Sequence, residues 1–444
     1  MFSERIELLD GYIRCNQLFL IIDIALIFHF CVTWYMKYKR TGLKVSYWHL
    51  FMFRNFFIQF LLLYPFNSSI KNFVSFGTNI FAADKFMDLA FIVTCTGYVS
   101  IIVGSWLAQF GKSFVLNLSP IHTFETFIEK NIKSKTATNI LIAVSLLFLF
   151  YMLTHTLGTR YLFNPRNYFI GNKDIRPIYS LLLNLYPLTV IFTGLRMIQL
   201  KDNNSSYSFF IVITLSIFLG TRISIIEPLM ILVFFYFIKN NEKVSFNKII
   251  LVLASFLTLL LLIAAFRQGK SENALTEILY GNHFSDTRDF AFLLAYFKDS
   301  WLNGKSYLAG FMTFIPRQYS EFRANWAFGL YCSHLVGIYS PLFPGHRPGY
   351  FGEIYMNFRI YGVIILGIWT GFVVTHIDNK ILKEFNNGKD VIKMYSYTFV
   401  AFFATTLSIS LISTQLYTVI TVIILLALMR HLISYGYYFY YGKK

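Results

Sequence analysis

Arginine side chains stand beside several long apolar runs, at points where the chain turns. Arg222 follows a Gly-Thr pair, Arg267 ends an apolar run, Arg317 follows a proline and Arg347 precedes one. A guanidinium group forks onto phosphate or carboxylate oxygens through two hydrogen bonds and tolerates partial burial. An arginine at a membrane boundary is costly unless it is paired, so it marks a functional site. These positions predict a site that binds an anion.

Polar clusters punctuate the segment 267–350. The first contains Asp286, Arg288 and Asp289 and fits the start of a helix, with carboxylates near the positive end of the helix dipole. The second, 317–323, reads either as an exposed ion-pair cluster of little energetic weight or as part of a site. The third holds His346 on a tight Pro-Gly loop just before Glu353. All three remain candidates for chemistry.

The elements that position these groups are membrane helices. The chain has 444 residues, 56% hydrophobic, 19% aromatic and only 14% charged, whereas soluble domains carry about a quarter charged residues. A bilayer needs about 20 apolar residues per helix, which predicts about eleven spans. We expect them near 17–36, 47–66, 86–108, 137–156, 179–197, 207–221, 223–238, 249–266, 352–375, 392–411 and 414–434, of which 207–221 and 223–238 could be one broken helix.

Charge orients these spans. Lys and Arg total 39 against 22 Asp and Glu, a net charge of +17. Segments 37–44, 112–135, 239–248 and 380–393 and the tail 443–444 are Lys-rich and join alternate spans, so the positive-inside rule makes them cytoplasmic. The N-terminus is then on the outer side of the membrane, which in a bacterial inner membrane is the periplasmic side, and the C-terminus is cytoplasmic. Arginines dominate the outer side, although a drift of exported loops toward arginine without function is the alternative: Arg5, Arg14, Arg160, Arg166, Arg176, Arg222, Arg267, Arg288, Arg317, Arg323, Arg347 and Arg359.

One outer segment is long enough to build a site. Segment 267–350 contains three apolar stretches, 289–301, 307–316 and 326–339, that are too short to span and predict interfacial helices. We therefore expect a lid-like loop at 267–350 between helices 1–8 in residues 1–266, with outer loops 67–85 and 157–178, and helices 9–11 with a cytoplasmic tail in residues 351–444. The predicted fold is an all-α polytopic integral membrane protein.

Several site patterns are absent from the sequence. No Gly-rich phosphate loop follows a strand, no His or Cys pair has metal-ligand spacing, and no Ser or Cys stands in a nucleophile elbow. An Asp-x-Asp pair at a membrane boundary is also missing. These absences disfavour nucleotide and metal chemistry.

Motifs around the long loop resemble those of a known family. The motifs GKSY at 304–307, FIPR at 314–317 and PGYFGEIYMNFRIYG at 348–362 look like those of the Wzy-type O-antigen or oligosaccharide repeat-unit polymerases. Some members carry an Arg with a Gly eleven positions later in two outer loops. Arg160 and Gly171 have this spacing, while Arg317 and Gly329 miss it by one residue.

The resemblance implies a bacterial inner-membrane glycosyltransferase of the GT-C type that acts in lipopolysaccharide and surface-polysaccharide biosynthesis. Donor and acceptor would both be oligosaccharides linked to undecaprenyl pyrophosphate. The growing chain would pass to one new repeat unit at the periplasmic face, with no cofactor and no metal. Membrane lipids and a chain-length regulator are the implied partners, and nucleic acid is not one. An arginine cluster would stabilise the charge that develops on the leaving pyrophosphate.

Residue roles follow from this resemblance. The donor pyrophosphate would be bound by Arg222, Arg288, Arg317 and Arg323, with Arg347 and Arg359 as alternatives. Arg160 and Arg166 would bind the second lipid-linked substrate. The base for the acceptor hydroxyl would be His346 or Glu353, with Asp286 third, each near a predicted membrane boundary where a pKa can be tuned. Sugars would stack on Tyr307, Trp326, Tyr350 and Tyr355.

Rival functions share parts of this pattern. An O-antigen ligase would use the same donor and the same arginines but transfer to the lipid A core. A lipid-linked oligosaccharide flippase or another transporter would need charges along a central cavity and internal repeats. The expected spans are nearly free of charge except at Asp23, Arg54 and Asp88. A membrane O-acyltransferase would need a histidine deep in a span, and His29 is the nearest candidate.

Overall fold

The structure is a computed structural model. It describes residues 5–8, 13–62, 86–110, 119–159, 168–169, 172, 175–201, 203–220, 223–249, 251–252, 254–255, 258, 286–297, 301–312, 315, 319–337, 348–409, 424, 427–428 and 431. Some predicted site residues lie outside these ranges, namely Arg160, Arg166, Arg222, Arg317, His346 and Arg347.

The described elements are helices, apart from one antiparallel hairpin formed by β1 (Arg5–Leu8) and β2 (Ile13–Asn16). Among the described residues, five helices are long and apolar enough to cross a membrane: Gln17–Thr41, Met87–Phe110, Lys135–Thr156, Ile178–Leu200 and Gly349–Asn387. Each coincides with an expected span. Val391–Thr405 is a shorter apolar stretch. The remaining expected spans and the orientation of the set stay predictions.

Local sequence signals set the ends of the first long helix. Asn16 caps α1 (Gln17–Thr41) because its side chain accepts a hydrogen bond from the backbone N–H of Leu18. Gly42 ends the helix in the left-handed conformation. Only 11% of the apolar window of α1 is buried, and Phe28 is 70% exposed. An apolar helix with so little protein around it is suited to face lipid.

The chain divides into two compact units. Unit 1 comprises residues 1–113, 261–379 and 401–416, and unit 2 comprises residues 114–260, 380–400 and 417–444. The proposed segments 1–266, 267–350 and 351–444 stay a prediction. Unit 1 contains α1 with α2 (Tyr47–Met52), the π-helix η1 (Phe53–Leu62), α5 (Met87–Phe110), the helices from the 267–350 segment and most of α18 (Gly349–Asn387).

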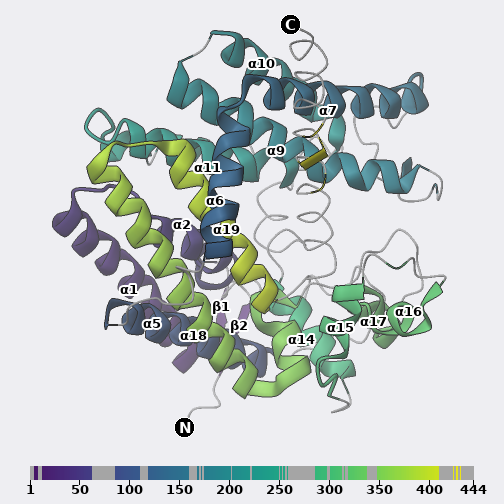
Figure 1. The fold of residues 1–444 in the computed structure, drawn as a ribbon. Coiled ribbons are helices and arrows are strands. Elements are labelled where there is room, and N and C mark those ends of the chain that lie inside the picture. The colour runs from purple at the N-terminus through teal and green to yellow at the C-terminus, as the bar shows by residue number, and fades with distance from the viewer. Residues whose placement is uncertain are drawn as a thin grey trace, which may run out of the picture. The chain divides into compact units, whose positions relative to one another are not determined.

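Four short helices form the described part of the expected lid. They are α14 (Asp286–Tyr296), α15 (Lys305–Phe311), α16 (Glu321–Trp326) and α17 (Phe328–Leu335). Figure 1 draws them in green, where α15, α16 and α17 lie side by side, and α14 packs against α5, η1 and α17. We call these the lid helices. Interfacial helices were expected at 289–301, 307–316 and 326–339. α14 and α15 begin three and two residues before the first two of these ranges, and α17 lies within the third.

Helices α5 and α18 approach each other closely because glycines face the contact. A Cβ on Gly104 would overlap the carbonyl of Ile368, and a Cβ on Gly371 would overlap the carbonyl of Ile101. Small residues allow membrane helices to pack backbone to backbone, where dispersion forces replace the hydrophobic effect. This contact fixes α18 within unit 1.

Unit 2 is a bundle around α9 (Arg176–Leu200). Helices α6 (Ser119–Lys133), α7 (Lys135–Thr156), α10 (Asn203–Leu215) and α11 (Ile223–Lys239) all contact α9, and a 3₁₀ turn, η4 (Ser216–Leu219), separates α10 from α11. Figure 1 shows α7, α9 and α10 running side by side. The hydroxyl of Tyr186 donates to the carbonyl of Val212, and that of Tyr179 to the carbonyl of Leu219. The expected ranges 207–221 and 223–238 overlap α10 with η4 and α11, which are separate elements of the described structure.

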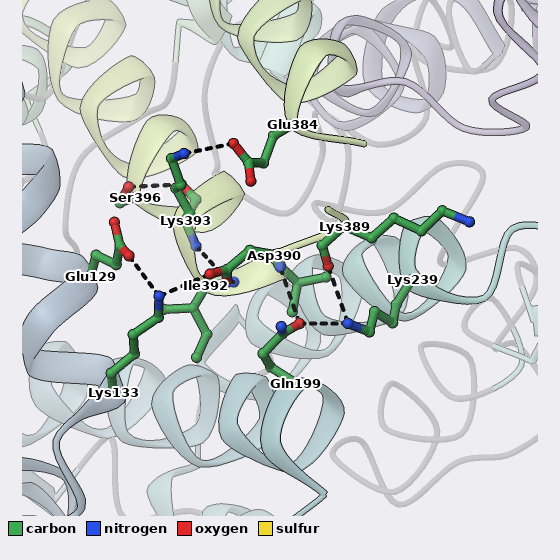
Figure 2. Close-up of polar contacts among 11 residues, drawn as sticks. Glu129, Lys133, Gln199, Lys239, Glu384, Lys389, Asp390, Ile392, Lys393 and Ser396 are labelled. Atoms are coloured by element: carbon green, nitrogen blue, oxygen red, sulfur yellow. Dashed lines mark hydrogen bonds and ion pairs between the residues drawn. The ribbon is translucent and has the colours of Figure 1, made fainter. Parts of the chain in front are cut away.

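A polar network joins one end of this bundle (Figure 2). Lys133 on α6 donates to Glu129 at 2.6 Å and to Asp390 at 2.8 Å, just before α19 (Val391–Ile409). Lys239 on α11 donates to Gln199 on α9 and to the carbonyl of Lys389. The Lys-rich segments 112–135, 239–248 and 380–393 therefore meet at one end of unit 2. Lys133 and Lys239 therefore also join neighbouring segments of unit 2 through hydrogen bonds.

Asp390 is the acceptor at the centre of this network. Its carboxylate also caps α19 by accepting from the backbone N–H groups of Ile392 and Lys393. Burial alone would raise the pKa of Asp390, but the hydrogen bond from Lys133 and those from the two backbone N–H groups outweigh burial and lower the pKa. Because the pKa is lowered, the bonds that Asp390 accepts stabilise the fold more when its carboxylate is ionised.

The helix crossing gives a first prediction. Gly371→Ala should destabilise the protein by about 1–3 kcal/mol, because the added Cβ meets the backbone of Ile101, which cannot move aside as a flexible side chain would. Thermal unfolding of the purified protein in detergent measures this. Gly388→Ala is the control, since its nearest neighbour would be Glu384 at 4.0 Å. Equal unfolding temperatures for both variants would contradict the close helix contact.

The polar network gives a second prediction. Asp390→Asn should lower stability at pH 7 by about 0.5–1 kcal/mol, since water screens the partly exposed pair. A lowered pKa contributes stability that is present above the unfolded value, about 3.9, and lost as the pH falls through the folded value. The difference between Asp390→Asn and the wild type should therefore shrink below pH 4. Glu242→Gln, at a pair whose carboxylate side chain is 83% exposed, should have little effect at either pH.

Candidate functional site

The longest helix is interrupted at Arg359. Within α18 this residue alone has non-helical dihedral angles, φ 57° and ψ −159°. That region of backbone space is essentially restricted to glycine, and another residue there costs about 1–3 kcal/mol. The short stretch before Arg359 carries Glu353 and Asn357, and the long apolar stretch follows it. Strain is therefore stored at the head of an apolar helix.

Three polar side chains form a buried cluster just before this break. Ser306 donates to Oε1 of Glu353 at 2.7 Å, and Nδ2 of Asn357 donates to the Ser306 hydroxyl at 2.8 Å. The same Nδ2 also donates to the carbonyl of Glu353. All three residues are at most 3% exposed. We call Ser306, Glu353 and Asn357 the Glu353 cluster.

The Glu353 cluster ties the start of α15 to α18. Oδ1 of Asn357 accepts from the backbone N–H of Gly304 at 3.0 Å, and the N–H of Leu302 donates to the carbonyl of Met356, also at 3.0 Å. The turn between them uses left-handed conformations at Asn303 and Gly304. Gly304 suits this turn because it has no Cβ to clash. Segment 302–306 is thereby held along α18.

The guanidinium group of Arg359 lies over one aromatic ring of a row of three. Its Cζ lies 4.4 Å from the ring centroid of Trp301, a cation–π distance. Trp301 meets the ring of Tyr355 edge to face at 5.6 Å, and Tyr355 meets Phe290 of α14 in the same way. Arg359 itself is exposed. An exposed cation on an aromatic platform can bind an anion attached to a sugar.

A second cation–aromatic pair lies on the lid helices. Nζ of Lys305 is 4.2 Å from the ring centroid of Trp326, and Tyr331 stacks near that ring at 5.8 Å with an interplanar angle of 22°. Lys305 is exposed and Trp326 is partly exposed. Trp326 was predicted to stack on sugar, and the structure gives it a cation as neighbour.

The charge of Glu353 affects nearby groups. Burial raises the pKa of Tyr307 well above its ordinary value, and Glu353 raises it further. Burial likewise raises the pKa of the Cys332 thiol well above its ordinary value, with a smaller contribution from Glu353. Tyr307 and Cys332 are therefore neutral at physiological pH, and neither supplies a nucleophilic anion.

The predicted pyrophosphate arginines occupy different environments. Arg288 is 1% exposed in the first turn of α14, 3.9 Å from Asp289, and burial lowers its pKa. Arg323 donates through Nη1 to the carbonyl of Ile315, and burial lowers its pKa too. Among the described residues, Nε of Arg323 has no hydrogen-bond partner. Of the three predicted arginines that the structure describes, Arg359 is the one with an exposed side chain.

The other predicted site residues also differ in how far they are enclosed by the protein. Tyr350 packs its ring against Phe51 and Phe56, and Tyr307 packs against Phe358. Asp286 begins α14, half-buried, and a Cβ on Gly349 would lie 3.5 Å from its Cβ. The expected helix start at Asp286, Arg288 and Asp289 is confirmed.

Sequence reasoning missed several partners of the predicted residues. It assigned no role to Ser306 and Asn357, which belong to the Glu353 cluster, to Trp301 beside Arg359 or to Lys305 beside Trp326. One signal was available. Glu353 and Asn357 are four residues apart, which puts both on one face of a helix. The partner on the other side, Ser306, lies 47 positions away in the sequence, and no periodicity connects it to Glu353.

Comparisons with known proteins return no relative. No family model, no curated protein and no solved structure matches the chain. Within the part of the chain that the structure describes, no three His, Cys, Asp or Glu side chains are grouped so that they could hold a metal ion.

The Glu353 cluster gives a third prediction. Asn357→Ala removes three hydrogen bonds and leaves the Gly304 N–H without its acceptor, which should cost about 2–3 kcal/mol. Thermal unfolding and the rate of proteolysis within 297–321 measure the effect. Asn240→Ala is the control, because Asn240 makes one exposed bond to Tyr236. If both variants unfold alike, the cluster does not hold segment 302–306.

Proposed function

We propose that this protein is an O-antigen (surface polysaccharide) polymerase. It transfers the growing glycan from undecaprenyl pyrophosphate onto a new undecaprenyl-pyrophosphate-linked repeat unit at the periplasmic face of the bacterial inner membrane. The observation that carries the proposal is the exposed guanidinium of Arg359, stacked on Trp301 at the head of an apolar helix. A lipid-linked sugar pyrophosphate presents a sugar, an anion and an apolar chain in that order, which fits an aromatic ring, a guanidinium and an apolar helix.

The chemistry needs little beyond charge stabilisation. The bond between the anomeric carbon and the pyrophosphate oxygen breaks, and the bonding electrons leave with undecaprenyl pyrophosphate. A hydroxyl oxygen of the acceptor sugar bonds to the same carbon and loses its proton to a base. Arg359 would stabilise the negative charge on the leaving pyrophosphate. Since pyrophosphate is a good leaving group, neither a general acid nor a metal is required.

The base is Asp286 or His346 in this proposal. Glu353 is less suited to the role, because Oε1 already accepts from Ser306 and the side chain is 3% exposed. Asp286 is half-buried and stands beside Gly349 at the start of α18. A base must reach the hydroxyl proton within hydrogen-bonding distance, which favours a group that is not enclosed.

The remaining arginines, apart from Arg288, keep their proposed substrates. The donor pyrophosphate would also be bound by Arg222, Arg317, Arg323 and Arg347, and the second lipid-linked substrate by Arg160 and Arg166. Arg288 is enclosed within unit 1 and supports the lid helices rather than the substrate. Trp326 and Lys305 offer a second place for sugar next to a cation.

A deletion strain tests this function. Without the gene, the surface polysaccharide should consist of a single capped repeat unit, and a plasmid copy should restore the polymer. Trp301→Ala should restore it about tenfold less well, because Arg359 loses its platform. Electrophoresis of the extracted lipopolysaccharide measures chain length.

A matched variant and two other outcomes complete the test. Tyr361→Leu changes a 71% exposed aromatic residue further along α18 and should restore normal chains. Full-length polymer that stays on its lipid carrier in the deletion strain would identify a ligase instead. Repeat units that fail to reach the periplasm would identify a flippase.

A further inference from the structure

We infer that Ser306, Glu353 and Asn357 are positioning residues that force Arg359 into its strained conformation and so hold its guanidinium over Trp301. The identity of the anion that Arg359 contacts rests on the proposed function. The coupling between the Glu353 cluster and Arg359 does not, and it has a test of its own.

The hydrogen bonds lie directly beside the Arg359–Trp301 contact, between residues that follow Trp301 and residues that precede Arg359. Leu302, which directly follows Trp301, bonds to Met356, and Gly304 bonds to Asn357, two residues before Arg359. Ser306 bonds to Glu353 one turn earlier on α18. Trp301 and Arg359 are therefore carried by two chain segments that the cluster fixes in register.

A purely structural role for the cluster leaves the strain unexplained. The bonds that hold segment 302–306 against α18 use residues 353–357 and do not themselves involve residue 359. Strained conformations persist only where the surroundings impose them, and they gather at ligand-binding sites. The strained residue here is the exposed arginine on an aromatic ring. We therefore associate the strain with the position of the Arg359 guanidinium over Trp301, and not with the attachment of the lid helices.

Glu353 acts through Arg359 in this arrangement rather than on the substrate. A neutral amide at position 353 could accept the same hydrogen bond from Ser306. Glu353→Gln should therefore keep most of the activity, within about threefold of the wild type, whereas loss of a general base would cost about 10²–10⁴-fold. Glu353→Ala, which removes the acceptor, should lose activity.

Thermal unfolding of two substitutions at one position tests the imposed strain. At an ordinary helix position alanine is more stable than glycine. At residue 359 we expect the reverse, with Arg359→Gly unfolding about 2–4 °C above Arg359→Ala. Tyr361, in the same helix, is the matched control, and Tyr361→Ala should unfold above Tyr361→Gly.

Coupling to the cluster is tested by repeating the comparison after the cluster is broken. With Asn357→Ala or Ser306→Ala in the same chain, the backbone at residue 359 can relax. The Arg359→Ala variant should then unfold at a higher temperature than the Arg359→Gly variant. Ser306→Ala serves where Asn357→Ala does not fold. Two results would overturn the inference. In one, Arg359→Ala unfolds above Arg359→Gly in the otherwise unchanged protein, as at the control position. In the other, Arg359→Gly still unfolds above Arg359→Ala after the cluster is broken.

Activity of the purified protein on lipid-linked repeat units gives the functional readout. Ser306→Ala should lower kcat about tenfold in the wild type and have no further effect after Arg359→Gly. Independent, multiplying losses would overturn the positioning role. If the wild-type protein forms no polymer, the proposed function fails, while the order of unfolding temperatures still decides whether the cluster strains Arg359.

Discussion

Polar groups buried beside a membrane helix must find their partners within the protein, since no water replaces a lost hydrogen bond. The carboxylate of Glu353 and the amide of Asn357 meet this constraint through one hydroxyl, that of Ser306, and through the backbone of segment 302–306. The lid helices and α18 therefore become one polar assembly in unit 1. Arg359, two residues after Asn357, adopts the strained backbone conformation.

The same constraint organises the polar end of unit 2 differently. There the groups are partly exposed, and Lys133, Lys239 and Lys389 engage carboxylates, an amide and a backbone carbonyl. Partly exposed ion pairs contribute little individually, and networks contribute more. These lysines thus serve the packing of α6, α9, α11 and α19 in addition to the orientation that their charge predicts.

The sequence predicted the long apolar helices and the helix start at Asp286 because both depend on local patterns. It also drew attention to Glu353 and Arg359, since each is charged at the edge of an apolar run. It could not pair Glu353 with Ser306 or Arg359 with Trp301, because those contacts join residues far apart in the sequence. The left-handed backbone at Arg359 had no signal at all, as glycine would be the expected residue there.

An assay with the purified protein tests whether it polymerises lipid-linked repeat units and whether Arg359 is needed. The protein is placed in liposomes with undecaprenyl-pyrophosphate-linked repeat units and a metal chelator, and both the glycan length and the released undecaprenyl pyrophosphate are measured. We expect polymer formation with one undecaprenyl pyrophosphate released for each new glycosidic bond, and a large fall in the amount of both products with Arg359→Ala. Unchanged repeat units with the wild-type protein, or normal polymer with Arg359→Ala, would contradict this expectation.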